Sequence, residues 1–313
     1  MQHFDSLDAV RLKQCALTIG AFDGVHRGHQ KIIARMKAGS SGAPLAVLTF
    51  YPHPSVVLHG RTPSFYLTSP DEKAELLGDF GVDVVITQTF DKGLSKLTAS
   101  DFLDRLADRL GMRSLWVGSD FALGHQREGD IPYLQAHAAD WNYSLHVVDP
   151  LNLDGEVVSS TRIREALRSG DVRRAASYLG RWFSIPGTIR RGAGRGKKLG
   201  IPTANLEVWP ERAFPKVGVY ACYARVGERW IPAVTNVGLR PTFEQASGRP
   251  TIEAHLLDYQ GDLYGDQIVL RFVDRLRNER KFDSALALFD QIGQDIERAR
   301  GTLAAASPTQ SAA

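Results

Sequence analysis

Residues 18–29 read Thr18-Ile19-Gly20-Ala21-Phe22-Asp23-Gly24-Val25-His26-Arg27-Gly28-His29 and combine the end of an apolar strand, a glycine turn and the start of a helical pattern. Backbone N–H groups at a helix N-terminus have no partners within the helix, and the helix dipole makes that end positive. The turn therefore predicts a site for nucleotide phosphates. His26 and His29, on the first turn of the expected helix, add side-chain donors at the same place.

The first half of the chain alternates short apolar strands with helical patterns. The strands lack polar alternation, which is expected of a parallel sheet covered on both faces. In such a doubly wound α/β fold, ligands bind beyond the carboxyl ends of the strands, where the turn at 20–29 lies. The predicted strands are Ala16–Phe22, Leu45–Phe50, Val82–Thr87, Ser114–Gly118 and Leu145–Val148, and the predicted helices are Gln30–Lys37, Asp71–Phe80, Ser100–Leu110 (N-cap Ser100), Pro132–Trp141, Ser160–Arg168 and Asp171–Leu179.

The pattern changes near Gly180, where short β-rich segments punctuated by Gly and Pro begin. Strands at this spacing predict a small antiparallel barrel, followed by a helix at Ser284–Arg300. The low-complexity tail from Ala304 is expected to be disordered. We therefore predict domains at 1–182 and 183–303 and a tail at 304–313. The predicted barrel strands are Ser184–Ile189, Val217–Val226, Trp230–Val237, Thr251–Leu257 and Gln267–Val273.

Length and composition describe a two-domain globular protein. The chain has 313 residues, of which 43% are hydrophobic, and its formal net charge of +3 gives no general case for a nucleic-acid or membrane partner. Cys15 and Cys222 are too few for a disulfide framework, and the N-terminus lacks the pattern of a signal peptide. These features predict a cytoplasmic enzyme. The sequence leaves the oligomeric state open, a weak homo-oligomer included.

A second element accompanies the histidine turn. Ser159-Ser160-Thr161-Arg162-Ile163-Arg164 opens a helix and offers hydroxyls, backbone N–H groups and a guanidinium to phosphate oxygens. Together, the two elements resemble the HxGH nucleotidyltransferases. The resemblance implies catalysis by positioning and by charge stabilisation at the attacked α-phosphate, with His26 and His29 on the ATP phosphates. The ATP-binding residues that it implies are Gly20, Phe22, Gly24, Gly28, Ser160, Thr161 and Arg162.

The second half carries its own chemistry. Thr203 and Asn205 project to the same face of an extended segment, where hydroxyl and amide oxygens suit Mg²⁺. Glu253 lies amid apolar neighbours in a predicted strand, and general base toward an alcohol is a task that would justify a carboxylate there. The basic, glycine-rich stretch 187–200 reads either as a cover over nucleotide phosphates or as an RNA-binding loop.

Five segments of this half, in order, resemble the riboflavin kinase domain: Pro202–Asn205, Gly218–Ala221, Asn236–Phe243, Ile252–Asp258 and Leu276–Phe282. Over residues 10–300 the chain resembles the bacterial bifunctional riboflavin kinase/FMN adenylyltransferases. The resemblance implies phosphorylation of riboflavin to FMN by the second domain, then adenylyl transfer from ATP to FMN by the first, giving FAD and pyrophosphate. Mg²⁺ is the implied cofactor, and riboflavin, FMN and ATP are the implied small-molecule partners.

The resemblance also implies residue roles. Glu253 would be the base of the kinase, and Thr203 and Asn205 would bind Mg²⁺ and phosphate. Arg277 and Glu279 would close the flavin site, although a surface ion pair explains them equally well. In the first domain His53 and Asp120 would contact flavin. Asp120 could instead contact the adenosine, and His53 could serve only to brace its Pro-rich turn. The implied ATP residues of the kinase are Gly192, Gly194, Gly196, Lys197, Gly200, Thr203 and Asn205.

Two positions in the first turn leave alternatives. Asp23 is either a catalytic carboxylate or, more in keeping with Phe-Asp-Gly, a residue that orders the turn. Ala21 stands where the family commonly has Asn, and a lost donor at a charged site can cost about 3 kcal/mol of barrier. Ala21 therefore predicts slower adenylyl transfer. The alternative is a riboflavin kinase whose first domain is weak or inactive. A non-enzymatic RNA-binding regulator would leave Glu253 without a role.

Overall fold

The computed structural model describes residues 1–60, 65–191, 201–239 and 250–308. Contacts divide the chain into two compact units, Met1–Ser160 and Thr161–Ala313. None of the described helices is long and apolar enough to cross a membrane.

The first unit is built on a six-stranded sheet in the order β1-β4-β3-β2-β5-β6, with every neighbouring pair parallel. The chain moves outward from β2 to one side and then returns to build the other, so β2 lies where the strand order reverses. Ligands bind at this switch point in open α/β sheets, and the histidine turn follows β2 directly. The strands are β1 (Gln2–Phe4), β2 (Cys15–Ile19), β3 (Leu45–Tyr51), β4 (Val84–Thr89), β5 (Met112–Gly118) and β6 (Ser144–Val148).

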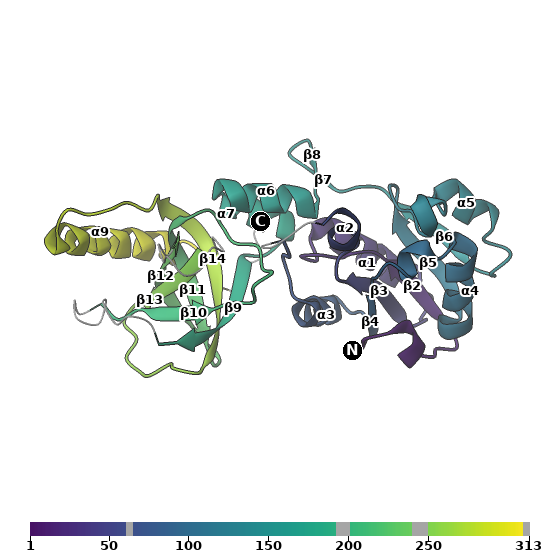
Figure 1. Ribbon diagram of the computed structural model, residues 1–313, viewed down its shortest axis with the longest axis horizontal. Coiled ribbons are helices and arrows are strands. Elements are labelled where there is room, and N and C mark those ends of the chain that lie inside the picture. Colours follow the sequence, from purple (N-terminus) through teal and green to yellow (C-terminus); the bar gives the residue numbers. More distant parts are fainter. Residues whose placement is uncertain (61–64, 192–200, 240–249, 309–313) are drawn as a thin grey trace. The chain divides into compact units, whose positions relative to one another are not determined.

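Helices cover both faces of this sheet (Figure 1). On one face, α1 (Arg27–Gly39) and α3 (Pro70–Asp79) pack Ile33 and Leu77 against Val47 and Val85 of the sheet. On the other, α4 (Ala99–Leu110) and α5 (Ile131–Ala136) pack on the remaining set of strand side chains. The doubly wound parallel sheet predicted for this half is confirmed.

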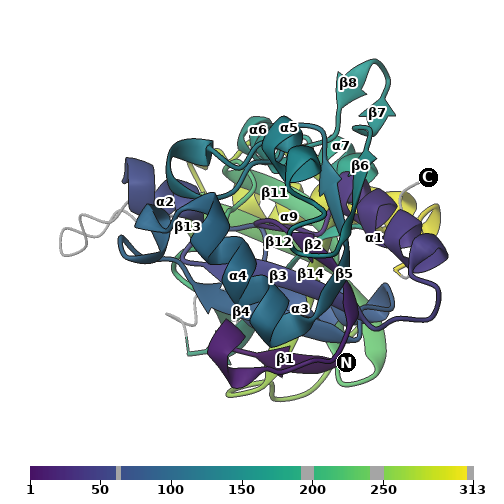
Figure 2. The same cartoon turned by 90° about the vertical axis from the view of Figure 1, so that its right-hand side faces the viewer.

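The sequence patterns predicted some helix ends in this unit incorrectly. The N-cap of α4 is Thr98, which accepts from the backbone N–H of Asp101 at 3.1 Å, and not Ser100. The helix predicted at Pro132–Trp141 ends at Ala136. The pattern also missed α2 (Pro54–His59), the short β7 (Asn152–Leu153) and β8 (Glu156–Val157) pair, and the edge strand β1, which Figure 2 shows beside β4.

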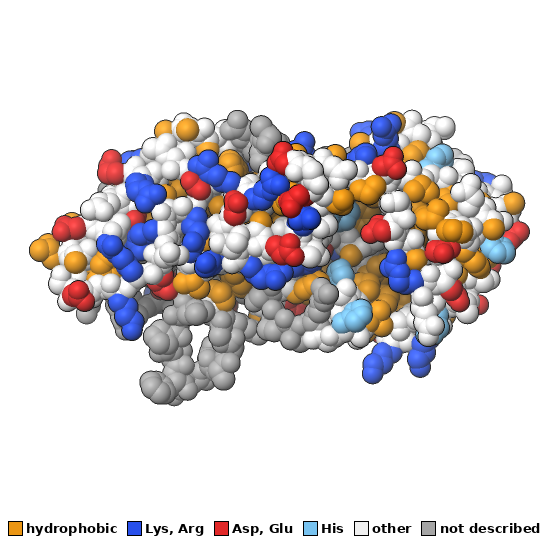
Figure 3. Space-filling model, turned by 90° about the horizontal axis from the view of Figure 1, so that it is seen from above, with side chains coloured by type: hydrophobic (Ala, Val, Ile, Leu, Met, Phe, Trp, Pro, Cys, Tyr) orange, Lys and Arg blue, Asp and Glu red, His pale blue; other side chains and the backbone are white. Residues whose placement is uncertain are grey.

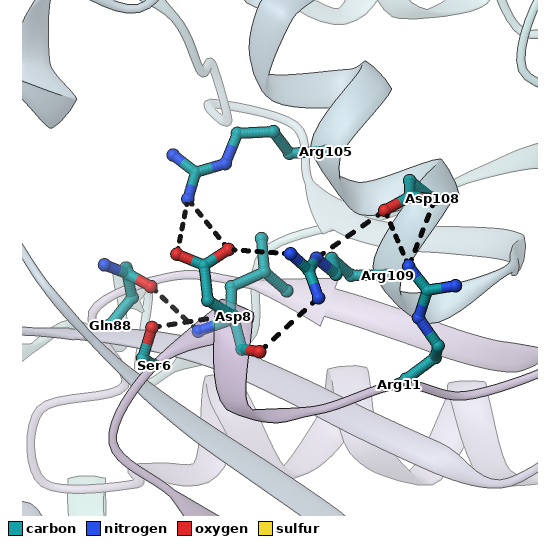
Figure 4. Close-up of polar contacts among 8 residues, drawn as sticks. Ser6, Asp8, Arg11, Gln88, Arg105, Asp108 and Arg109 are labelled. Atoms are coloured by element: carbon teal, nitrogen blue, oxygen red, sulfur yellow. Dashed lines mark hydrogen bonds and ion pairs between the residues drawn. The ribbon is translucent and has the colours of Figure 1, made fainter.

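A polar network joins the chain after β1 to α4 (Figure 4). Asp8, in the single turn η1 (Leu7–Ala9), pairs with Arg105 at 3.2 Å and Arg109 at 3.6 Å. Arg11 pairs with Asp108 at 3.2 Å. These side chains are exposed, so the pairs add little stability, and the buried Leu7 anchors the segment instead.

The second unit is a closed antiparallel barrel in the order β10-β13-β12-β11-β14-β9, as the sequence predicted. Helix α9 (Ala285–Ala304) packs outside it, with Ala299 and Leu303 against Val219, Ala221 and Tyr223. Side chains on the alternate positions fill the interior, where Tyr220, Cys222 and Phe272 are buried. The strands are β9 (Phe183–Arg190), β10 (Ala204–Glu207), β11 (Gly218–Val226), β12 (Arg229–Leu239), β13 (Pro250–Leu256) and β14 (Gln267–Arg277).

The contact grouping places the limits of this unit elsewhere than the predicted domains at 1–182 and 183–303, which stay predictions. By contacts, α6 (Ser160–Ser169) and α7 (Val172–Leu179) group with the barrel rather than with the first domain, and Arg173 pairs with Asp274 at 2.8 Å. Residues 304–308 were predicted to belong to a disordered tail, but Ala304 is the last residue of α9 and Ala305 is its C-cap. The Ser307 carbonyl accepts a hydrogen bond from Trp182 at 3.1 Å. Residues 309–313 lie outside the described residues.

Candidate active sites

The histidine turn brings two imidazoles together at the start of α1. His26 is the N-cap of the helix, and its Nδ1 accepts from the backbone N–H of His29 at 3.4 Å. The two rings stack with centroids 3.6 Å apart, and His26 is buried. Both predicted catalytic histidines therefore lie at the positive end of α1, where an anion is stabilised.

Asp23 orders the loop beside this turn. Its carboxylate accepts from the backbone N–H of Leu67 at 2.9 Å and of Thr68 at 3.2 Å. The Thr68 hydroxyl in turn accepts from the Gly24 N–H at 3.1 Å, and Gly24 has a φ of 81°, which favours glycine. These bonds support the structural interpretation of Asp23.

The Ser-Thr-Arg element meets the same turn through its first residue. The Ser160 hydroxyl donates to the Asp23 carbonyl at 2.8 Å. A Cβ on Gly28 would lie 3.5 Å from the Val158 carbonyl, so the segment before Ser160 also runs close to the turn. The structure thus places Ser160 against the turn at Asp23, within the segment that contains the predicted residues Gly20, Phe22, Gly24 and Gly28. Thr161 and Arg162 follow Ser160 on the first turn of α6, beyond the boundary between the compact units.

The first unit also contains an apolar cavity of about 560 Å³. It lies beyond the carboxyl ends of β2 and β3, at Ile19 and Phe50, and between α2 and the loop after β5. Four phenylalanines line it: Phe50, Phe90, Phe102 and Phe121. A cavity of this size and character suits a flat aromatic ring system.

Neither residue predicted to bind flavin in this unit lines the cavity. His53 is the N-cap of α2, where Nδ1 accepts from the Ser55 N–H at 3.0 Å, and Asp120 is exposed. Their chain neighbours Pro54 and Phe121 do line it. The wall of this cavity is mainly apolar, and contact of His53 and Asp120 with flavin stays a prediction. The stretch at 94–97 carried no motif and was missed.

In the barrel, strand register assembles the second site. Glu253 of β13 pairs with Asn205 of β10 on one side and with Asn236 of β12 on the other. The row continues through Val219 of β11 to Arg277 of β14. Residues paired across antiparallel strands point to the same face. Because Ile252 and Ala254, on either side of Glu253, are buried inside the barrel, this row faces outward.

A cavity of about 310 Å³ lies over this row, beneath the first half of α9. Thr203 and Glu253 line it together, as does Glu279, whose Oε1 lies 3.5 Å from the Asn236 amide nitrogen. Phe282, Leu288 and Ile292 form an apolar part of the wall. The cavity thus combines a carboxylate and a hydroxyl with a surface for an apolar ring. The predicted ATP residues Gly192, Gly194, Gly196, Lys197 and Gly200 lie outside the described residues.

Arg277 has a partner that the sequence did not indicate. Its Nη2 lies 2.8 Å from Oδ2 of Asp295 in α9, and its Nε donates to both carboxylate oxygens at 2.9 Å. Gln291 also donates to Asp295, which is only 1% exposed. Arg277 is therefore part of a buried pair between β14 and α9, at the wall of the cavity, rather than of a surface ion pair.

We expect Asp295→Ala to lower the free energy of unfolding of the barrel by about 3 kcal/mol, because the Arg277 charge would stay largely buried without its partner. The KM for the ligand of this cavity should rise as well. Asp258→Ala is the matched control, since Asp258 also pairs with an α9 arginine, Arg300 at 2.8 Å, but both side chains are exposed. Denaturant unfolding should separate the two variants, and equal midpoints would contradict the assignment.

These sites and folds define a two-unit, nucleotide-dependent transferase, with an HxGH α/β unit and a kinase-like barrel. A family model described as FAD synthetase matches residues 8–162, and one described as riboflavin kinase matches residues 179–303. The chain belongs to the bifunctional riboflavin kinase/FMN adenylyltransferase family.

Relatives of this family match over nearly the whole chain. The bifunctional riboflavin kinase/FMN adenylyltransferase of Pseudomonas fluorescens is 40% identical over 294 residues, covering 93% of each chain. That of Escherichia coli K12 is 37% identical over 290 residues, covering 91% of this chain and 92% of its own. A solved structure titled as a macrolide-efflux protein from Streptococcus pneumoniae superposes with a TM-score of 0.86 at 27% identity, over 96% of this chain and 98% of that one.

Proposed function

We propose that the two cavities carry out successive steps of flavin cofactor synthesis. The barrel phosphorylates riboflavin to FMN with ATP. The α/β unit then transfers the adenylyl group of a second ATP to FMN, which gives FAD and pyrophosphate. One observation carries this proposal: each unit has an apolar cavity together with polar groups that suit phosphate chemistry. These groups are the histidines at the start of α1 in the first unit, and Thr203 and Glu253 in the barrel.

In the barrel, riboflavin would occupy the cavity with its ring against Phe282, Leu288 and Ile292. Glu253 would accept the proton of the ribityl 5′-hydroxyl as that oxygen attacks the γ-phosphate. The alternation of β13 supports this role, since it turns Glu253 outward into the cavity while its neighbours stay inside the barrel. The buried pair of Arg277 and Asp295 would keep the wall in place.

Magnesium fits the oxygen donors at this site. The hydroxyl of Thr203 and the amide of Asn205, beside the Glu253 carboxylate, are hard ligands, and phosphate oxygens and water would complete the shell. The described residues contain no group of three His, Cys, Asp or Glu side chains that could hold a metal by themselves. When bound with ATP, the ion would neutralise phosphate charge.

In the α/β unit, the isoalloxazine ring of FMN would enter the cavity lined by Phe50 and Phe121. His26 and His29, at the positive end of α1, would stabilise charge on the triphosphate while the FMN phosphate attacks the α-phosphate of ATP. Ser160 would contribute from the segment bonded to Asp23. That Thr161 and Arg162, on the same helix turn, bind the triphosphate remains a prediction.

We further propose that the protein works in the cytoplasm, with small molecules and no nucleic acid or membrane as its partners. Its formal net charge is only +3. On the face displayed in Figure 3, acidic side chains lie among the basic ones on both units. Binding to a phosphate backbone depends on concentrated positive charge, and the small net charge of the chain supports this proposal.

Incubation of the protein with riboflavin and ATP-Mg²⁺ tests the proposal. We expect FMN to appear first and FAD to follow, with both resolved by chromatography. Chelation of the metal should stop FMN formation, and added Mg²⁺ should restore it. FMN that is never converted to FAD would leave only the kinase, and an absence of flavin turnover would overturn both assignments.

A further inference from the structure

Lys73 of α3 is a buried cation beneath the histidine turn. It is 5% exposed, although lysine is almost never buried without partners. Its Nζ donates to the Ala21 carbonyl at 3.0 Å and to the Thr49 hydroxyl at 2.8 Å. Burial lowers the pKa of Lys73 to about 8, against the opposing effect of Asp23, so the ammonium is charged at neutral pH.

The Ala21 carbonyl accepts from a second donor, the Thr49 hydroxyl, at 2.9 Å. Two donors on one oxygen fix the plane of the peptide between Ala21 and Phe22. In a trans peptide the C=O and N–H groups point in opposite directions, so the Phe22 N–H is aimed away from Lys73. Within the described part of the chain, that N–H donates no hydrogen bond.

The backbone at Phe22 is strained as well. Its φ of 49° lies in the left-handed region, which is an outlier for a bulky side chain. Such strain persists only where the surroundings hold it, and it concentrates at functional sites. The bonds from Lys73 and Thr49 hold the peptide immediately before this residue. Because Ala21 has no polar side chain, the donors at this point of the turn belong to the backbone.

We propose that Lys73 is a positioning residue for adenylyl transfer, which with Thr49 holds the Ala21–Phe22 peptide so that the Phe22 N–H donates to a phosphate of ATP. The inference rests on the proposed function of the α/β unit. On this inference, a buried side chain of α3, and not only the histidines, preorganises the phosphate site.

Lys73→Met removes the donor and keeps the length of the side chain. We expect kcat/KM for ATP in FAD formation from supplied FMN to fall on the order of 10–100-fold. The KM for FMN should change less than the KM for ATP, because Lys73 bonds the turn and Thr49 at 3.0 and 2.8 Å but reaches the carbonyl of Phe50, in the cavity wall, only at 3.4 Å. FMN formation from riboflavin, which takes place in the barrel, should stay unchanged.

Two further variants separate positioning from folding. Thr49→Val, at a fully buried site, should lower kcat/KM for ATP in the same way but less, since Lys73 would still hold the carbonyl. Lys73→Gln keeps an N–H donor and should recover part of what Lys73→Met loses. Lys37→Met is the matched control, because Lys37 is exposed on α1, and it should behave as the unsubstituted protein.

The outcomes distinguish this inference from the function on which it rests. If the unsubstituted protein makes no FAD, the proposed function of the first unit fails. If it makes FAD and Lys73→Met does so at an unchanged kcat/KM for ATP, the positioning role is wrong. A rise in the KM for FMN as large as that for ATP would also overturn it, since general loosening of the unit predicts that result.

Discussion

Glu253→Gln is expected to stop FMN formation while supplied FMN is still converted to FAD. Glutamine keeps the shape of the side chain but cannot accept the proton of the ribityl hydroxyl, and a general base contributes about 10²–10⁴-fold. The kcat of the kinase step should fall by that factor, with a much smaller change in the KM for riboflavin. Chromatography of the flavins, with riboflavin or FMN as the starting substrate, measures the two steps separately.

Glu207→Gln is the control for this variant. Glu207 lies on β10 of the same barrel, where it pairs with Arg190 at 2.7 Å, and both side chains are exposed. Its replacement should leave both activities intact. A Glu253→Gln protein that retained more than a tenth of the kinase rate, or that lost both activities while folded, would contradict the assignment of the base to this cavity.

The opposite pattern is expected for His29→Ala, which should lose FAD formation and keep FMN formation. Removal of one preorganised donor from a site of developing charge costs about 10²–10³-fold in kcat. The substitution should leave the helix start intact, because the cap of α1 uses the backbone N–H of residue 29 and the side chain of His26. The rate of conversion of supplied FMN with ATP gives the measurement.

His137→Ala provides the comparison for this loss. His137 lies at the end of α5 and pairs with Asp140 at 2.8 Å on the surface. Its replacement should change neither activity. If His29→Ala converted FMN at the unsubstituted rate, or if it also abolished riboflavin phosphorylation, the separation of the two reactions between the two units would be wrong.

The parts of the sites that lie within one chain segment were predictable. A strand, a glycine turn and a helix follow from local patterns, although the helix predicted at Gln30–Lys37 begins at Arg27 and the strand predicted to Phe22 ends at Ile19. The structural role of Asp23 follows from the Phe-Asp-Gly sequence. The placement of Glu253 on a strand, with polar and apolar neighbours alternating, was also readable. The partners of Asp23 themselves were not predicted, since Asp23 accepts from Leu67 and Thr68, which lie 44 and 45 residues further along the chain.

The parts that depend on contacts between distant segments were not predictable. The partner of Arg277 lies 18 residues away in helix α9, which carries several acidic residues that the sequence does not distinguish. The aromatic cavity draws Phe50, Phe90 and Phe121 from separate strands and loops. The strands β1 and β10 are only 3 and 4 residues long, and their pairing with distant strands, not their composition, makes them strands.

The row from Asn205 to Arg277 limits how this barrel can change over evolution. Side chains of a strand alternate between the two faces of the sheet. The insertion of one residue within β13 before Glu253 would therefore turn the Glu253 side chain to the opposite face. The carboxylate would enter the packed interior, and an aliphatic side chain would take its place in the cavity. A closed barrel has no free edge at which to absorb such a slip. Length variation among functional descendants should therefore be confined to the connections between strands.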